Sequence, residues 1–380
     1  MKINTQLPIL FRDYKSALRE KCQDYSSAVA IIDEQLADLY EIPYAQIAVK
    51  TGESAKTLQE AERCWKEMHR IGLDRRSVVI AIGGGATTDL GGFVGSCYMR
   101  GIPTIYVPTT LLAMADAAIG GKTGINFSGI KNLIGTFHDP DLTIIDITLL
   151  QTLPDREYRS GIAEIIKSAI ISDDDFFKHL ELEMPKILYR DPNALTNAIA
   201  RACTIKSTIV NQDRRESSLR AILNYGHTFA HAIEALNPML HGEAVAIGMS
   251  CAAHVSAAMG LCSQLTIDRL EALCHAASLP TALSDTISDE ELLAMMRSDK
   301  KNENGKLNLI LTKNPGNVFR VADVNPTTIK EALTKKRHYD AHRNRSADST
   351  QCTPQNRQQK NTNADRSLQI GTTGNPCKRK

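Results

Sequence analysis

The first 150 or so residues alternate short, almost wholly apolar runs with helical stretches, and this alternation constrains the fold more than any other feature. The apolar runs have the length of strands and are rich in β-branched residues; they cover residues 28–33, 77–82, 104–108 and 142–147. Strands without polar alternation are covered on both faces, as in parallel sheets flanked by crossover helices. The pattern therefore predicts an α/β domain built on a parallel sheet.

After Pro154 the strand-like runs nearly cease, and apolar residues recur at helical spacing. A chain of 380 residues also exceeds what one hydrophobic core usually serves. From residue 337 the composition shifts to Arg, Asn, Gln, Ser and Thr, which cannot bury enough apolar surface to order a chain. We expect an α/β domain over 1–153, a mostly α-helical domain over 154–336, and a disordered, polar and basic tail over 337–380.

Charge and hydropathy exclude several classes of protein. The formal net charge of +2 supplies no strong field for a polyanion, so we expect no nucleic-acid partner. No run reaches the ~18 apolar residues of a membrane helix, and the N-terminus lacks the apolar core of a secretory signal. We therefore expect a cytoplasmic protein without a membrane partner. Its nine cysteines form no CxxC pair and are expected to be reduced.

Two glycine-rich segments could approach phosphate groups. Gly83–Gly85 follow the run 77–82, where backbone N–H groups at a helix start would favour a pyrophosphate. The G-x-G-x-x-G fingerprint is absent, so a simple tight turn is an equal alternative. Gly120, Gly121 and Lys122 form the second segment; Asp116 precedes them, and Lys131 and Asn132 follow. Lysine and amide donors suit a phosphate or polyhydroxylated anion, and a carboxylate could carry a proton.

Three histidines and one glutamate suggest a metal site in the helical region. Glu164 and Lys167 are neighbours on a predicted helix, as are His227 and His231, and His241 follows ten residues later. One carboxylate and two or three imidazoles suit a catalytic zinc ion, which takes three protein ligands and keeps a position open. The H-E-x-x-H pattern of zinc peptidases is absent. Histidines satisfied within a core are an equal alternative.

A last group of charged residues could hold an anionic substrate. Lys206, Glu216, Arg220 and Asn224 lead into the histidine segment, and a Lys300-Lys301 pair follows far downstream. Arginine binds carboxylates and phosphates through a bidentate fork. The spacing alone favours a solvated charged helix face instead.

Taken together, these segments resemble the 3-dehydroquinate synthases, a family of sugar phosphate cyclases. The resemblance runs from about Ala28 to Asn325. The matching segments are GGGATTDLGGF, YMRGIP, VPTTLLAMADAAIGGKTGIN, KNLIGTF, TLPDREYRSGIAEIIK, HGEAVAIGM and SDKKNENGKLNLIL. It implies an N-terminal NAD-binding α/β domain and a helical metal-binding C-terminal domain, with the active site between them, and usually a homodimer.

The resemblance also implies roles for individual residues. Glu164, His227 and His241 match the zinc ligands, with Co²⁺ a possible substitute, whereas His231 matches a residue at the substrate phosphate. Arg100 matches an arginine that reaches the phosphate from the neighbouring subunit, and Lys300 or Lys301 matches a late phosphate contact. The NAD-contacting positions are Asp33, Glu53, Lys56, Gly84, Gly85, Asp89, Thr109, Thr110, Lys122 and Lys131. The remaining substrate positions are Asp116, Lys122, Asn132, Lys167, Lys206, Glu216, Arg220 and Asn224.

The chain departs from the family pattern at four places. Ala117 and Ala118 occupy positions that are often serines, Arg214 stands where a glutamate usually follows Asp213, and Ala230 replaces a common glycine. The segment 40–47 is also short. None of these departures removes a matched zinc ligand or charged substrate contact.

The implied activity is a lyase reaction of the shikimate pathway, which leads to chorismate and the aromatic amino acids. The substrate, 3-deoxy-D-arabino-heptulosonate 7-phosphate, is a sugar-acid phosphate that becomes 3-dehydroquinate and phosphate. The steps are transient oxidation with NAD, phosphate elimination, re-reduction and intramolecular aldol closure. Three alternatives are another sugar phosphate cyclase, a net oxidoreductase resembling glycerol dehydrogenases, and a non-enzymatic binding or scaffold protein.

Overall fold

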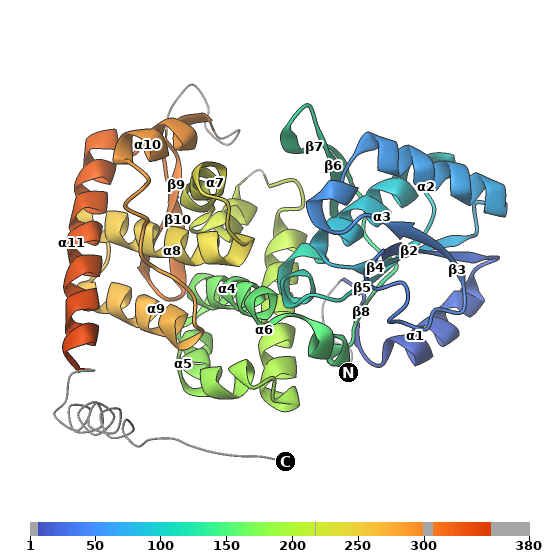
Figure 1. Cartoon of the computed structure of the whole chain (residues 1–380), viewed down its shortest axis with the longest axis horizontal. Coiled ribbons are helices and arrows are strands. Elements are labelled where there is room, and N and C mark those ends of the chain that lie inside the picture. Colours follow the sequence, from blue (N-terminus) through green and yellow to red (C-terminus); the bar gives the residue numbers. More distant parts are fainter. Residues whose placement is uncertain (1–6, 217, 299–306, 351–380) are drawn as a thin grey trace, which may run out of the picture. The chain divides into compact units, whose positions relative to one another are not determined.

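The computed structural model describes residues 7–216, 218–298 and 307–350. The chain separates into two compact units, Met1–Leu333 and Thr334–Lys380. The first unit contains an N-terminal α/β domain and a mostly helical C-terminal domain, which confirms the predicted fold class (Figure 1). None of the helices in the described ranges is both long enough and apolar enough to cross a membrane.

The N-terminal domain is built on one six-stranded parallel sheet. Its strand order is β1-β8-β5-β4-β2-β3, and every neighbouring pair is parallel. The strands are β1 (Ile9–Phe11), β2 (Ala28–Asp33), β3 (Ala45–Val49), β4 (Val78–Gly83), β5 (Thr104–Pro108) and β8 (Leu142–Ile145). The four runs predicted from the sequence thus form the four central strands.

Both faces of this sheet are covered, which explains the absence of polar alternation. On one face, Val29, Ile31 and Val79 pack against side chains of α2 (Leu58–Ile71) and α3 (Gly85–Cys97). Ala30 and Ile32 point the other way, into a core that includes α1 (Tyr14–Lys21) and the helical domain. Because successive strand residues face opposite sides, each strand needs apolar residues throughout.

A separate antiparallel ribbon joins the sheet to the site. It consists of β6 (Lys122–Phe127) and β7 (Ile130–Phe137), with Lys122 opposite Phe137. The ribbon starts at the second glycine-rich segment, so Lys122 lies at its base. Several of its apolar side chains are exposed, including Phe127, Ile130 and Leu133.

The C-terminal domain is organised around two buried helices, α4 (Asp155–Ser172) and α8 (His241–Ala258), which pack against each other. Around them lie α5 (Asp174–Leu188), α6 (Pro192–Gln212), α7 (His227–Leu236), α9 (Gln264–Ala276) and α10 (Asp289–Ser298). Strand β9 (Leu309–Asn314) pairs antiparallel with β10 (Asn317–Val321).

The last helix differs from the disordered tail expected from residue 337. Helix α11 spans Pro326–Thr350. Its sequence EALTKKRHYDAHRNR is rich in Ala, Lys and Arg, which are good helix formers. In the second unit the Lys336 ammonium lies 3.1 Å from the Asp340 carboxylate one turn later, a spacing that supports a helix. Residues 351–380 lie outside the described ranges.

Candidate active site and metal centre

The carboxyl ends of the central strands form one side of the site. In the strand order, β2 is followed by β3 on one side, whereas β4 lies on the other side of β2. Ligands of open parallel sheets bind in the crevice at such a reversal. Asp33 ends β2, where its carboxylate accepts hydrogen bonds from the Thr51 hydroxyl (2.7 Å) and the Gln35 N–H (3.0 Å). Gly84 and Gly85 follow β4 at the same edge.

The glycines after β4 allow neighbouring loops to approach the start of α3. Gly84 is the N-cap of this helix. A Cβ on Gly84 would lie 3.2 Å from the Thr110 methyl group, and one on Gly85 would lie 2.9 Å from the Cβ of Ala117. The Thr109 N–H also donates to the Gly83 carbonyl (2.9 Å), which ties the loop after β5 to this turn. The helix start can therefore present its N–H groups to a phosphate.

A buried lysine gathers several predicted cofactor residues. Lys56 is 2% exposed, and its ammonium lies 2.7 Å from the Asp89 carboxylate and 3.8 Å from that of Glu53. It also donates to the side-chain carbonyl of Asn132. Burial raises the pKa of Asp89 by more than Lys56 lowers it. Asn126, which the sequence did not single out, donates to Glu53 (2.7 Å) and accepts from the Asn132 N–H (2.9 Å).

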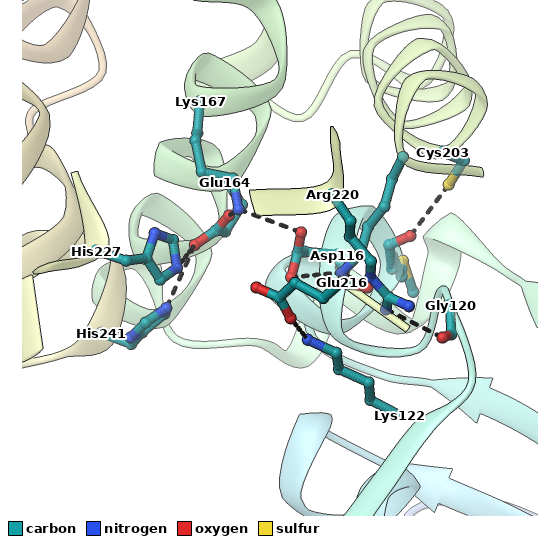
Figure 2. Close-up of polar contacts among 12 residues, drawn as sticks. Asp116, Gly120, Lys122, Glu164, Lys167, Cys203, Glu216, Arg220, His227 and His241 are labelled. Carbon is teal, nitrogen blue, oxygen red and sulfur yellow. Dashed lines mark hydrogen bonds and ion pairs between the residues drawn. The ribbon is translucent and has the colours of Figure 1, made fainter. Parts of the chain in front are cut away.

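The candidate metal centre consists of Glu164, His227 and His241, as Figure 2 shows. Nε2 of His227 lies 3.6 Å and Nε2 of His241 lies 3.3 Å from Oε1 of Glu164. Ligand atoms about 2.0–2.2 Å from a tetrahedral zinc ion lie roughly 3.3–3.6 Å apart, so these separations fit. Both Glu164 oxygens are buried, and neither accepts a hydrogen bond of ordinary geometry. In the described part of the chain, no other His, Cys, Asp or Glu triplet converges in this way.

Each histidine of the triplet is oriented through its second ring nitrogen. Nδ1 of His241 lies 3.2 Å from the Glu234 carboxylate, and Nδ1 of His227 lies 3.3 Å from the Tyr225 carbonyl. A hydrogen bond from Nδ1–H leaves the Nε2 lone pair to bind a metal. Glu234 was missed from the sequence. It stands seven residues after His227 and therefore on the same face of α7, which is the signal that could have identified it.

The charges of the centre favour a cation. Burial raises the pKa of Glu164, but Lys167 and His241 outweigh burial, and the net pKa lies well below its usual range. Burial lowers the pKa of His241, whereas Glu164 and Glu234 raise it, to about 9. Without a metal, His241 therefore carries a proton at neutral pH in the place that the ion would take.

Close backbone packing brings the three ligands together. Gly242, which follows His241, donates its N–H to the Ser160 hydroxyl (2.9 Å). A Cβ on Gly242 would lie 1.9 Å from the Ser160 carbonyl oxygen, so only glycine lets α8 approach α4 this closely. Gly226, the N-cap of α7, has a φ of +79°, and its Cβ would lie 2.7 Å from the Met249 nitrogen. The glycines beside the histidines thus set the ligand positions.

A carboxylate and two buried lysines adjoin the metal centre. The Asp116 carboxylate lies 3.4 Å from the Lys167 ammonium and 2.8 Å from that of Lys206. Lys167 also forms an ion pair with Glu164, which connects the two groups (Figure 2). Burial raises the pKa of Asp116, but the two lysines outweigh burial, so the net pKa lies below its usual value. Burial lowers the pKa of Lys206, and the neighbouring Asp116 raises it by less, so the net pKa of Lys206 is lowered. Of these groups, Lys206 is therefore the ammonium most ready to lose its proton.

The predicted anion-holding residues form a second cluster that bridges the two domains. Lys122 pairs with Glu216, whose other oxygen accepts from the Asn224 amide (2.5 Å). Arg220 is 2% exposed and donates to the Gly120 carbonyl (3.1 Å). The second glycine-rich segment and the segment before α7 therefore meet at one place (Figure 2).

Some predicted residues lie apart from these clusters. His231 is not one of the triplet, although its ring stands edge-on to that of His227 with centroids 5.6 Å apart. Arg100 is exposed at the end of a short turn after α3 and joins none of the described groups. Lys131 is exposed on β7. Burial raises the pKa of Glu234, and the charge of Lys131 is among the effects that lower it. Lys300 and Lys301 lie outside the described residues.

Comparisons with known proteins agree with this geometry. Residues 46–160 match the model of the 3-dehydroquinate synthase N-terminal region, and residues 161–302 match that of its C-terminal region. The chain is 44% identical over 303 residues to a 3-dehydroquinate synthase of Rhodopirellula baltica, covering 79% of this chain and 80% of the relative. It is 39% identical over 330 residues to that of Symbiobacterium thermophilum, covering 83% and 92%.

Solved structures show the same fold. The 2-epi-5-epi-valiolone synthase ValA from Streptomyces hygroscopicus subsp. jinggangensis, solved with NAD⁺ and Zn²⁺, is 29% identical. It has a TM-score of 0.80 and covers 88% of this chain and 98% of its own. A 2-deoxy-scyllo-inosose synthase, 24% identical with a TM-score of 0.78 over 86% and 96% of the two chains, shares the fold. The family models and these relatives place the chain in the 3-dehydroquinate synthase family.

Proposed function

We propose that the chain is a 3-dehydroquinate synthase that uses NAD and zinc to convert 3-deoxy-D-arabino-heptulosonate 7-phosphate into 3-dehydroquinate and phosphate. The observation that carries this proposal is the triplet Glu164, His227 and His241. It lies beside the group formed by Asp116, Lys167 and Lys206. The anion-holding cluster, which bridges the domains, is also close by. Relatives that are 39–45% identical over most of the chain bear the same name.

The residues fit both cofactors. The buried Glu164 oxygens, faced by two Nε2 atoms, supply a zinc donor set, and Asp33, the α3 start and Lys56 line the strand ends where a dinucleotide would lie. When bound, zinc acidifies a coordinated hydroxyl and NAD accepts and returns a hydride. Cobalt is a plausible substitute, because it accepts the same nitrogen and oxygen ligands.

The chain's own residues would hold the substrate and move its protons. Arg220 is well suited to a carboxylate, because among the described residues its guanidinium gives two of its five donors to the Gly120 and Arg214 carbonyls. Asp116, held ionised by Lys167 and Lys206, can accept a hydroxyl proton.

Lys122, Asn132 and His231 would hold the phosphate, together with Lys300 or Lys301. Because Lys122 is paired with Glu216, a phosphate must exchange with that carboxylate when it binds. Lys122 then acts as a point charge on the leaving group.

A homodimer in which Arg100 serves the neighbouring site is part of the proposal. Arg100 is exposed, and Phe127, Ile130, Leu133 and Phe137 of the β6–β7 ribbon are each 41–47% exposed, which suits a covered interface. The test mixes R100A protein with E164Q protein. Each is inactive alone if the proposal holds, whereas subunit exchange restores about a quarter of the active sites by statistical mixing. Failure to regain activity in proven mixed dimers would contradict the role of Arg100. The cytoplasmic location stays a prediction.

The substrate is tested by comparing sugar phosphates. Sister cyclases act on sedoheptulose 7-phosphate or glucose 6-phosphate, neither of which carries a carboxylate, and ValA at 29% identity makes this the second candidate function. We expect phosphate release from the heptulosonate phosphate and little from the other two, and we expect R220M to reduce that preference. Faster release from either sugar phosphate that lacks the carboxylate would overturn the assigned substrate. A structure described as a probable glycerol dehydrogenase from Sinorhizobium meliloti shares the fold at 16% identity, which carries no activity to this chain.

A further inference from the structure

Arg214 connects the two domains beside the anion-holding cluster. It follows α6 in the C-terminal domain, and its guanidinium lies 2.5 Å from the carboxylate of Asp139, which lies between β7 and β8 in the N-terminal domain. The two side chains are 56% and 28% exposed, so the ion pair is accessible to water. The proposed reaction does not use either residue.

Both ends of this ion pair are linked to residues expected to hold the substrate. The Arg214 carbonyl accepts a hydrogen bond from the Arg220 guanidinium (2.7 Å). On the other side, a Cβ on Gly121 would lie 2.1 Å from Oδ1 of Asp139, so this carboxylate packs directly on the turn that leads into Lys122. The ion pair therefore joins the segment that carries Arg220 to the turn that carries Lys122.

The segment after α6 is also shaped by hydrogen bonds within its own domain. The Asp213 carboxylate accepts the N–H groups of Ser218 (2.7 Å) and Arg220 (3.0 Å), which shapes the segment without attaching it to the sheet domain. Three interactions attach this segment to the sheet domain. They are the hydrogen bond from Arg220 to the Gly120 carbonyl and the ion pairs Lys122–Glu216 and Arg214–Asp139. The Lys122–Glu216 pair must adjust when a phosphate binds, whereas the Arg214–Asp139 pair lies outside the expected substrate contacts.

We propose that Arg214 and Asp139 form a positioning ion pair that holds Arg220 and Lys122 at their working separation between the two domains. The inference deepens the proposed function and rests on it, since it assumes that both cations hold one anionic substrate. Neither residue touches the substrate. The ion pair keeps the segments that carry Arg220 and Lys122 ordered before the substrate binds, so less conformational entropy is lost on binding. Loss of the ion pair should therefore change KM more than kcat.

The decisive variant is D139N, because it separates positioning from simple charge. Asn keeps the shape of the side chain but removes a negative charge near an anionic substrate. If only charge mattered, KM for the sugar phosphate would fall. If the ion pair positions the cations, we expect KM to rise about three- to tenfold with kcat within about twofold, as for loss of a partly exposed coupled pair. An unchanged or lowered KM in D139N would overturn the proposal.

Two further variants and one control complete the experiment. R214Q should raise KM like D139N, and the exchanged pair D139R/R214D should recover at least part of the loss; no recovery in a folded double variant counts against the proposal. The control is R12Q, which breaks the exposed Arg12–Glu20 pair (2.6 Å) within the N-terminal domain and should leave KM unchanged.

A second readout does not depend on activity. Hydrogen exchange of the Ser218 and Arg220 amides should be faster in D139N and R214Q than in the wild type, and equal exchange would contradict the proposal. A wild-type protein that releases no phosphate would refute the proposed function, whereas the exchange result would still decide whether the ion pair orders this segment.

Discussion

The contact between Gly242 and Ser160 gives a sharp prediction, because two effects of replacing Gly242 with alanine have opposite signs. Alanine favours a helix over glycine by about 1 kcal/mol, so propensity alone predicts that G242A stabilises the protein. In the structure, however, the added Cβ would lie 1.9 Å from the Ser160 carbonyl oxygen. Ordinary contact begins at 3.4 Å, so α8 and α4 would have to separate locally by about 1.5 Å.

The size of this shift decides which effect wins. Overpacking of a tight contact costs about 1–3 kcal/mol, and a clash between two backbones lies at the upper end, so we expect a net loss of about 2 kcal/mol. The shift also moves His241, whose Nε2 lies 3.3 Å from Glu164. Metal sites tolerate only about 0.2 Å in ligand distance, so zinc affinity should fall by at least about a hundredfold.

The assay combines thermal unfolding of the metal-free protein with zinc competition against a chromophoric chelator. The control is A258G at the other end of α8, which should cost up to about 1 kcal/mol through propensity and leave zinc affinity unchanged. If G242A bound zinc like the wild type and unfolded at the same or a higher temperature, the account of how α4 and α8 set the ligands would be refuted.

Three further changes probe the site. E234Q removes the carboxylate from Nδ1 of His241 and should weaken zinc binding about 10–100-fold in the competition assay, whereas unchanged affinity would exclude a role in orienting the ring. Because Glu164 and Glu234 overcome burial and raise the pKa of His241 to about 9, zinc must displace its proton at neutral pH. Affinity should therefore rise up to about tenfold per pH unit until pH 9, and calorimetry in two buffers should show proton release; no buffer dependence at pH 7 would contradict this. K206M leaves Asp116 only the more distant Lys167 and should lower kcat/KM at least about a hundredfold at unchanged zinc content; near-normal turnover would remove Lys206 from the reaction.

The parts of the fold that were predictable depend on local patterns. Runs such as 28–33 are apolar throughout because both faces of the sheet are covered, so their strand character and parallel pairing could be inferred. Asp33 and Gly84 then fall at strand ends by sequence order alone. Helix α11 was harder, because a polar composition rich in Lys and Arg is compatible with either a helix or a disordered tail.

The site was predictable only where its residues carry a recognisable chemical pattern. Glu164, His227 and His241 were identified through a resemblance, since spacing alone made His231 an equal candidate. The Glu234–His241 contact and the Arg214–Asp139 pair escaped notice because each depends on two segments that meet only in the folded chain. Such contacts form where glycines allow two helices or turns to approach each other. The sequence alone does not show which segments come together in this way.

The most direct test of the central claim follows phosphate and NADH together in one reaction. The heptulosonate phosphate is given to zinc-loaded enzyme with a trace of NAD⁺, and E164Q serves as the control. We predict that phosphate release greatly exceeds the NAD⁺ supplied while NADH does not accumulate, and that E164Q, which lacks a charged metal ligand, releases almost none. One NADH formed for each phosphate, or full activity in E164Q, would contradict an account in which this triplet holds the ion that serves a redox-neutral reaction.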